Sequence, residues 1–92
     1  MAEGIVMDAR YLDLIERVKN AQFRTTRLSP GYDEEEVDNL LDRVVAVLRE
    51  SELPDPEELR TVQFTTRRLR PGYVMQDVDG LLREIAETVA AL

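Results

Sequence analysis

Apolar residues recur at intervals of three and four in two long segments of the chain, a spacing typical of amphipathic helices. The positions are Val37, Leu40, Leu41, Val44, Val47 and Leu48 in the first segment, and Val78, Leu81, Leu82, Ile85, Val89 and Leu92 in the second. The pattern predicts two helices of about seventeen residues, each about 25 Å long at a rise of 1.5 Å per residue.

A shorter helix is predicted upstream of each long one. In the first case the same spacing appears at Tyr11, Leu14, Ile15 and Val18. In the second case Asp55 stands where an N-cap is expected and Pro56 at the first helical position, ahead of the apolar Leu59 and Val62. Each half of the chain therefore contains a short helix followed by a long one.

The two halves share a repeated sequence pattern. An offset of 41 residues places residues 22–41 on residues 63–82 without a gap, and twelve of the twenty pairs are identical. The shared pattern is Q-F-x-T-x-R-L-x-P-G-Y, four variable residues, then V-D-x-L-L. We read residues 1–92 as a single domain made of two repeats, 10–50 and 52–92. Since about 40 residues rarely fold alone, the repeats should pack on each other.

A Pro-Gly pair precedes each long helix. Proline fixes φ and glycine accepts positive φ, so Pro30-Gly31 and Pro71-Gly72 predict type II turns. Asp33 is the expected N-cap of the first long helix, which begins with three glutamates that favour the helix dipole. In the second repeat Val74 takes the place of this cap, so the second helix start should be weaker, although Asp77 still lies in its first turn.

The arms between the short helices and the turns, Phe23–Leu28 and Phe64–Leu69, are rich in threonine and lack regular apolar alternation. They allow a short β-ribbon between the arms. The expected fold class is mainly α, with two tandem repeats of short helix, arm, turn and long helix packed as a pseudo-two-fold helical pair. The 22 residues from Glu50 to Gly72 are long enough for parallel and antiparallel pairing alike. The apolar face of residues 11–18 leaves homodimerisation open.

Composition argues against catalysis. The chain has no cysteine and no histidine, which removes disulfides, thiol nucleophiles and the commonest general base. Ser29 and Ser51 have no evident base, Lys19 is isolated, and there is no glycine-rich phosphate loop. Residues 33–36 are acidic but lack the glycine and the distant glutamate of a calcium loop. We expect no enzyme activity, no cofactor, no metal and no small-molecule substrate.

Charge is distributed unevenly along a chain of net charge −7. Residues 22–32 and 63–73 contain five arginines and no acid, whereas the other 70 residues carry a net −12. The five are Arg24, Arg27, Arg67, Arg68 and Arg70. If both arms lie at one end, they form a basic face suited to an anionic membrane surface or an acidic protein partner. The overall acidity disfavours nucleic acid.

The repeated aromatic residues are expected to pack at the turn and helix entry rather than to bind a ligand; they are Phe23, Tyr32, Phe64 and Tyr73. Asp38 and Asp79 recur one residue after a core valine, and each is expected to accept a hydrogen bond or ion pair from an arm arginine. Arg27 and Arg68 are the candidates, because they repeat at the same offset. Leu28 and Leu69 can be either exposed anchors or core residues.

No segment contains the roughly 18 consecutive apolar residues of a transmembrane helix. Met1–Arg10 has no basic region ahead of an apolar run, so it does not resemble a secretory signal. The sequence predicts a cytoplasmic protein.

The runs from Gly31-Tyr32 to Leu41 and from Gly72-Tyr73 to Leu82 follow an upstream phenylalanine and a basic arm. They resemble the membrane-targeting module of the DivIVA family of bacterial cell-pole and septum scaffolds, with its run G-Y-x-x-x-x-V-x-x-[FL]-L. The likeness covers most of residues 10–92. It implies a helical module with parallel pairing that is recruited to the inner membrane face, at the pole or septum, in cell division or polar growth.

In that family the loop before Gly-Tyr presents an exposed phenylalanine, which enters the bilayer, and an arginine, which meets phosphates. This chain has Leu28-Ser29 and Leu69-Arg70 there, and no long C-terminal coiled coil follows within residues 1–92. The resemblance then implies that the leucines insert, while the phosphate contacts come from Arg27, Arg68 and Arg70. The alternative is a cytosolic protein–protein interaction module without membrane binding.

Overall fold

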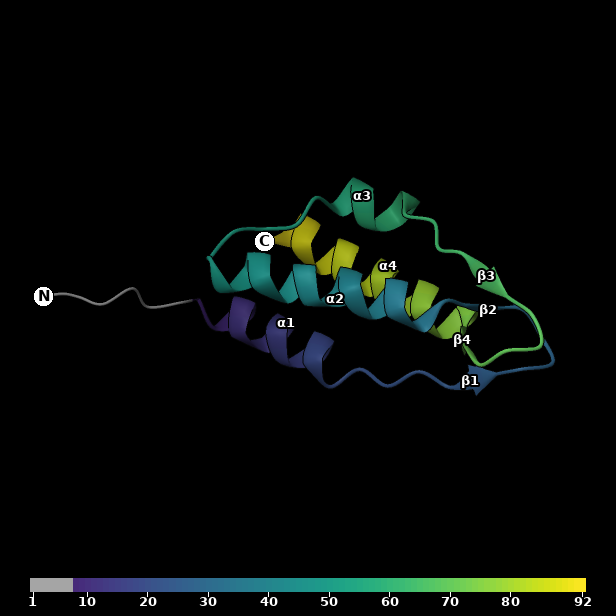
Figure 1. Ribbon diagram of the computed structural model, residues 1–92. Coiled ribbons are helices and arrows are strands. Elements are labelled where there is room, and N and C mark those ends of the chain that lie inside the picture. Colours follow the sequence, from purple (N-terminus) through teal and green to yellow (C-terminus); the bar gives the residue numbers. More distant parts are fainter. Residues whose placement is uncertain (1–7) are drawn as a thin grey trace, which may run out of the picture.

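The computed structural model describes residues 8–92, and the expectations for residues 1–7 lie outside this range. Four helices and four very short strands follow one another along the chain (Figure 1). They are α1 (Ala9–Lys19), β1 (Thr25–Thr26), β2 (Gly31–Tyr32), α2 (Glu34–Arg49), α3 (Pro56–Thr61), β3 (Thr66–Arg67), β4 (Gly72–Val74) and α4 (Met75–Ala91). The expectation of a mainly helical fold is confirmed.

The two long helices have the predicted lengths, 16 residues in α2 and 17 in α4. Both begin next to the strands and run side by side toward the opposite end of the molecule, so their pairing is parallel (Figure 1). The short helices α1 and α3 run the other way, α1 along α2 and α3 along α4. All four strands and both interhelical arms therefore lie at one end.

Helix starts follow the capping rules. Asp33 accepts a hydrogen bond from the backbone N–H of Glu36 at 2.9 Å, and Asp55 accepts one from that of Glu57 at 2.9 Å. These side chains satisfy N–H groups that have no partner within the helix. Helix α4 has no side-chain cap because Val74 occupies the N-cap position. The predicted cap on α2 and the predicted lack of one on α4 are confirmed.

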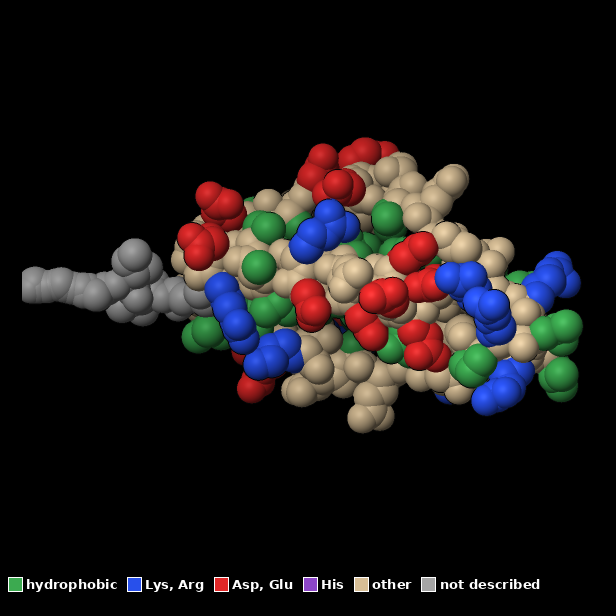
Figure 2. Space-filling model, viewed as in Figure 1, with side chains coloured by type: hydrophobic (Ala, Val, Ile, Leu, Met, Phe, Trp, Pro, Cys, Tyr) green, Lys and Arg blue, Asp and Glu red, His purple; other side chains and the backbone are tan. Residues whose placement is uncertain are grey.

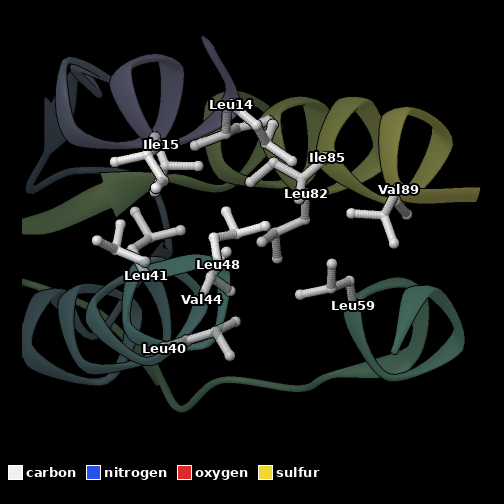
Figure 3. Packing of buried hydrophobic residues seen from close by; sticks show 14 of the residues in the cluster. Leu14, Ile15, Leu40, Leu41, Val44, Leu48, Leu59, Leu82, Ile85 and Val89 are labelled. Atoms are coloured by element: carbon white, nitrogen blue, oxygen red, sulfur yellow. The ribbon is translucent and has the colours of Figure 1, made fainter. Parts of the chain in front are cut away.

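One hydrophobic core joins all four helices (Figure 3). Its residues are Leu14, Ile15, Val18, Val37, Leu40, Leu41, Val44, Val45, Leu48, Leu59, Val78, Leu81, Leu82, Ile85, Ala86 and Val89. Two predicted members, Val47 and Leu92, are only half-buried. Val45 and Ala86, 41 residues apart, are buried instead, because a short helix packs beside each long one and widens its apolar face.

The apolar face of residues 11–18, which the sequence left open for homodimerisation, is buried within the chain. Leu14, Ile15 and Val18 retain 4%, 7% and 4% of their exposed surface, since α1 packs against α2 within the same chain. In this structure the apolar face of α1 instead covers part of the core that the two long helices leave open.

The strands form a four-stranded antiparallel sheet of order β1-β4-β2-β3. Each arm strand pairs with the Gly-Tyr strand of the other repeat: Thr25 lies opposite Tyr73, and Tyr32 lies opposite Thr66. The ribbon between the two arms, which the sequence allowed, is not formed. The arms lie at the two edges of the sheet, because β2 and β4 pair with each other in its centre.

The glycines do not serve a type II turn, since neither has a positive φ. Gly31 and Gly72 instead face each other across the central strand pair. A Cβ on Gly31 would lie 2.9 Å from the carbonyl carbon of Gly72, so only glycine permits this approach. The chain reverses earlier, in the bends at residues 27–29 and 68–70. The left-handed residue there is Leu69, with φ 62°.

Candidate functional site

The two bends, here called the first loop (residues 27–29) and the second loop (residues 68–70), form the tip of the molecule. They lie at the strand end, beyond the long helices (Figure 1). Leu28 is 93% exposed and Leu69 is 81% exposed. The choice between anchor and core that the sequence left open is thus decided in favour of exposure. A leucine this exposed contributes little to its own fold.

Side chains of two kinds gather at this end. Figure 2 shows hydrophobic side chains at the extremity and basic ones around them, whereas clusters of acidic side chains are scattered over the helical body visible in that view, among fewer basic ones. The tip is therefore both apolar and basic on a chain of net charge −7. The charge separation expected from the sequence is present in space.

A backbone hydrogen bond holds the two loops together. The N–H of Leu69 donates to the carbonyl oxygen of Arg27 at 3.1 Å. The first loop is also closed on itself, because the N–H of Ser29 donates to Oγ1 of Thr26 at 3.3 Å. The two loops that carry the exposed leucines are consequently joined to each other at the tip.

Two of the five arm arginines are engaged within the fold. Arg24 contacts Asp77 at 2.8 Å, and Arg67 contacts Asp33 at 2.6 Å. Arg24 also donates its backbone N–H to Asp77 at 3.0 Å. Both acids lie at the start of a long helix, so these ion pairs fasten each arm to the helix of the other repeat.

The two aspartates in these ion pairs have lowered pKa values. Hydrogen bonds from the side chain and backbone of Arg24 lower the pKa of Asp77 to about 2. The pKa of Asp33 is lowered by the backbone N–H of Glu36 and by the Arg67 side chain. Both acids thus keep their charge under mildly acidic conditions, and the two pairs persist there.

Arg27, Arg68 and Arg70 are exposed and make no ion pair among residues 8–92. They are the arginines adjacent to the exposed leucines. Arg70 borders a shallow hollow that it shares with Glu34 and Glu35. The arm charge of +5 is therefore reduced at the tip to three arginines that can bind a partner.

The repeated aspartates do not bind arginine as expected. The Tyr73 hydroxyl donates to Asp38 at 2.8 Å, and the Tyr32 hydroxyl donates to Asp79 at 2.8 Å. The assignment of Arg27 and Arg68 as their partners was wrong. Each aspartate lies on the long helix within reach of the tyrosine in the Gly-Tyr strand of the other repeat, whereas Arg27 and Arg68 are exposed in the loops.

The aromatic residues pack, as expected. Phe23 lies against Tyr73 and Phe64 against Tyr32, each with ring centroids 5.0 Å apart. Burial and the hydrogen bond to an aspartate raise the pKa of Tyr32 and that of Tyr73 to about 12. Pro30 and Pro71 lead into the central strands from the loops. The four aromatic residues are half-buried, whereas Pro71 is exposed and borders the same hollow as Arg70.

Sequence reasoning missed the acids that hold the arms. Glu36 accepts hydrogen bonds from the backbone N–H and the hydroxyl of Thr65, both at 2.8 Å. Glu36 and Asp77 are 41 residues apart, as are their partners Thr65 and Arg24. The available signal was an acidic residue at the same position of both repeats. It was overlooked because acidic residues are common in the first turn of any helix.

No helix within residues 8–92 is long and apolar enough to cross a bilayer. Comparison of the chain with protein-family models, with curated proteins and with solved structures gives no match.

Proposed function

We propose that this protein is a non-catalytic, DivIVA-like module that is recruited to the anionic inner face of the bacterial membrane through its tip and serves cell division or polar growth. The observation that carries the proposal is the exposure of Leu28 and Leu69 beside three arginines that make no ion pair within the described chain. Exposed apolar side chains next to cationic ones suit the interface between headgroups and acyl chains.

The magnitudes are compatible with reversible binding. Full burial of a leucine contributes about 1.5–3 kcal/mol, and each arginine near an anionic leaflet contributes about 1 kcal/mol. Two leucines and three arginines then give at most about 6–9 kcal/mol, against a loss of translational and rotational freedom. Repulsion from the acidic body is partly screened, since the Debye length is about 8 Å at physiological salt. The expected contact is weak and depends on anionic lipid.

The cross-repeat contacts support a pseudo-two-fold arrangement. The Tyr32–Asp79 and Tyr73–Asp38 hydrogen bonds involve residues at the same places in the two repeats. The same holds for the two aromatic pairs and for the backbone bonds from Asp33 to Thr65 and from Val74 to Arg24. We infer that the two repeats are related by this symmetry, which brings both loops to one end.

Flotation with vesicles tests the proposal. The purified protein should float with vesicles that contain phosphatidylglycerol, more at low than at physiological salt, and should not float with pure phosphatidylcholine. The double variant Leu28→Ser/Leu69→Ser and the triple variant Arg27→Ala/Arg68→Ala/Arg70→Ala should both lose binding.

Matched controls exist on the helical body. Leu12 is 51% exposed, so Leu12→Ser removes an exposed leucine away from the tip. The triple variant Arg43→Ala/Arg49→Ala/Arg83→Ala removes three exposed arginines from the long helices. Both controls should bind like the unmodified protein. Absence of flotation under every condition would discard the membrane role and favour the alternative, a cytosolic module whose tip contacts an acidic protein.

A further inference from the structure

The two loops of the tip differ in sequence at places where the repeats otherwise agree. The first loop contains Ser29 where the second contains Arg70. Just before the loops, Thr26 corresponds to Arg67. These differences give the tip two unequal halves.

The loops are fastened differently. Thr26 closes the first loop locally by accepting the N–H of Ser29. Arg67 instead reaches the start of α2 and donates two hydrogen bonds to Asp33, at 3.0 and 2.6 Å. The residue directly before the second loop is thereby tied to a long helix by a partly buried charged contact, whereas the ion pair of the first arm, Arg24–Asp77, lies three residues before its loop.

The backbone of the second loop is also unusual. Leu69 has φ 62°, a conformation that a residue with a branched apolar side chain adopts at an energetic cost. Leu28 has no positive φ. The hydrogen bond from Leu69 N–H to the Arg27 carbonyl holds this conformation. Strain of this kind is found where a binding surface has to be presented.

The charged residues beside the two leucines also differ between the loops. Leu69 lies between Arg68 and Arg70, both exposed and without an ion pair in the described chain, whereas Leu28 lies between Arg27 and a serine. An arginine on each side lets the second loop contact two phosphates around one inserted side chain.

We infer that the second loop is the principal contact of the tip with an anionic phospholipid bilayer, and that the first loop supports it through the Arg27 carbonyl. This inference rests on the proposed function and adds which residues determine the binding. It makes Leu69 and Arg70 more important than Leu28 and Ser29.

A charge transposition tests it. The variant Ser29→Arg/Arg70→Ser keeps the net charge and moves one arginine from the second loop to the first. With vesicles of phosphatidylcholine and phosphatidylglycerol, we expect binding about fivefold weaker than that of the unmodified protein, the loss of about one arginine contact. Unchanged binding would mean that only total charge matters, and the inference would be overturned.

The two leucines provide a second, independent comparison. Leu69→Ser should weaken binding about tenfold, and Leu28→Ser less than about threefold. Both positions are exposed, so unchanged circular dichroism is expected for both variants. Equal losses overturn the inference and leave the proposed function standing. Absence of binding by the unmodified protein overturns the proposed function and the inference together.

Discussion

The hydroxyl of Tyr32 donates a hydrogen bond to Asp79 at 2.8 Å, which joins the central strand of the first repeat to the long helix of the second. Tyr73 makes the corresponding bond to Asp38. Together with the pairing of each arm to the other repeat's strand, these bonds make the two repeats interdependent. Neither repeat contains its own sheet partner, so we expect the domain to unfold as one unit.

The tyrosine hydroxyls should each stabilise the fold. Tyr32→Phe and Tyr73→Phe remove a hydrogen bond to a carboxylate and keep the ring, so each should lower the free energy of unfolding by about 1–2 kcal/mol. Urea denaturation measures this directly. Tyr11→Phe is the control, because the Tyr11 hydroxyl makes no hydrogen bond within residues 8–92. A loss for Tyr11→Phe as large as that for the strand tyrosines would argue against the bonds.

Asp77 should make the free energy of unfolding depend on pH in the acidic range. Its pKa is about 2 in the folded protein against 3.8 for the ordinary side chain. Between these values the unfolded chain binds more protons, so this contribution is complete above about pH 5 and is lost as the pH falls toward 2. Asp77→Asn should therefore be less stable than the unmodified protein at neutral pH and should approach it at about pH 2.

Thermal melts across this pH range measure the effect of Asp77. Asp42→Asn serves as the control, since Asp42 is exposed on α2 and makes no hydrogen bond among the described residues. Parallel pH profiles for Asp77→Asn and the unmodified protein would contradict the role of the Arg24–Asp77 pair.

Replacement by alanine should have opposite effects on stability at Gly72 and at Gly80. A Cβ on Gly72 would lie 3.0 Å from the backbone of Gly31, so Gly72→Ala should cost about 1–3 kcal/mol by overpacking. A Cβ on Gly80, within α4, would meet nothing within 4 Å, so Gly80→Ala should stabilise by about 0.5–1 kcal/mol. Chemical denaturation of the two variants checks both signs, and a neutral Gly72→Ala would show that the strands can separate at no cost.

Because Leu69 has a left-handed backbone conformation, its replacement by glycine should change stability and vesicle binding in opposite directions. Leu69→Gly relieves a backbone conformation that disfavours side chains, so the free energy of unfolding should rise by about 0.5–1 kcal/mol. The same change removes the apolar side chain and should weaken vesicle binding. Leu28→Gly is the matched variant. Because Leu28 has no positive φ, glycine relieves no strain there and should lower the free energy of unfolding slightly. Equal stability changes in both would contradict the strain at Leu69.

Much of the helical framework could be read from the sequence, because it depends on local chemistry. The apolar spacing placed both long helices. The N-cap position is occupied by Asp33 in one and by Val74 in the other, which predicted which helix start has a side-chain cap. The match of residues 22–41 to residues 63–82 showed that the arm, the Pro-Gly pair and the first apolar positions of the long helix occur twice. Helix periodicity and capping involve residues within a few positions of one another, so they leave a direct trace in the sequence.

What the tertiary structure decided are the contacts between the repeats. The sequence shows that Gly31, Tyr32 and Asp38 recur, but it does not say that each meets a residue of the other repeat. Local reasoning assigned the glycine to a turn and the aspartate to an arginine, whereas a close strand approach and a tyrosine are found. The exposure of Leu28 and Leu69 was undecided for the same reason: burial depends on which surfaces meet in space, and only packing of the two repeats leaves both leucines outside the core.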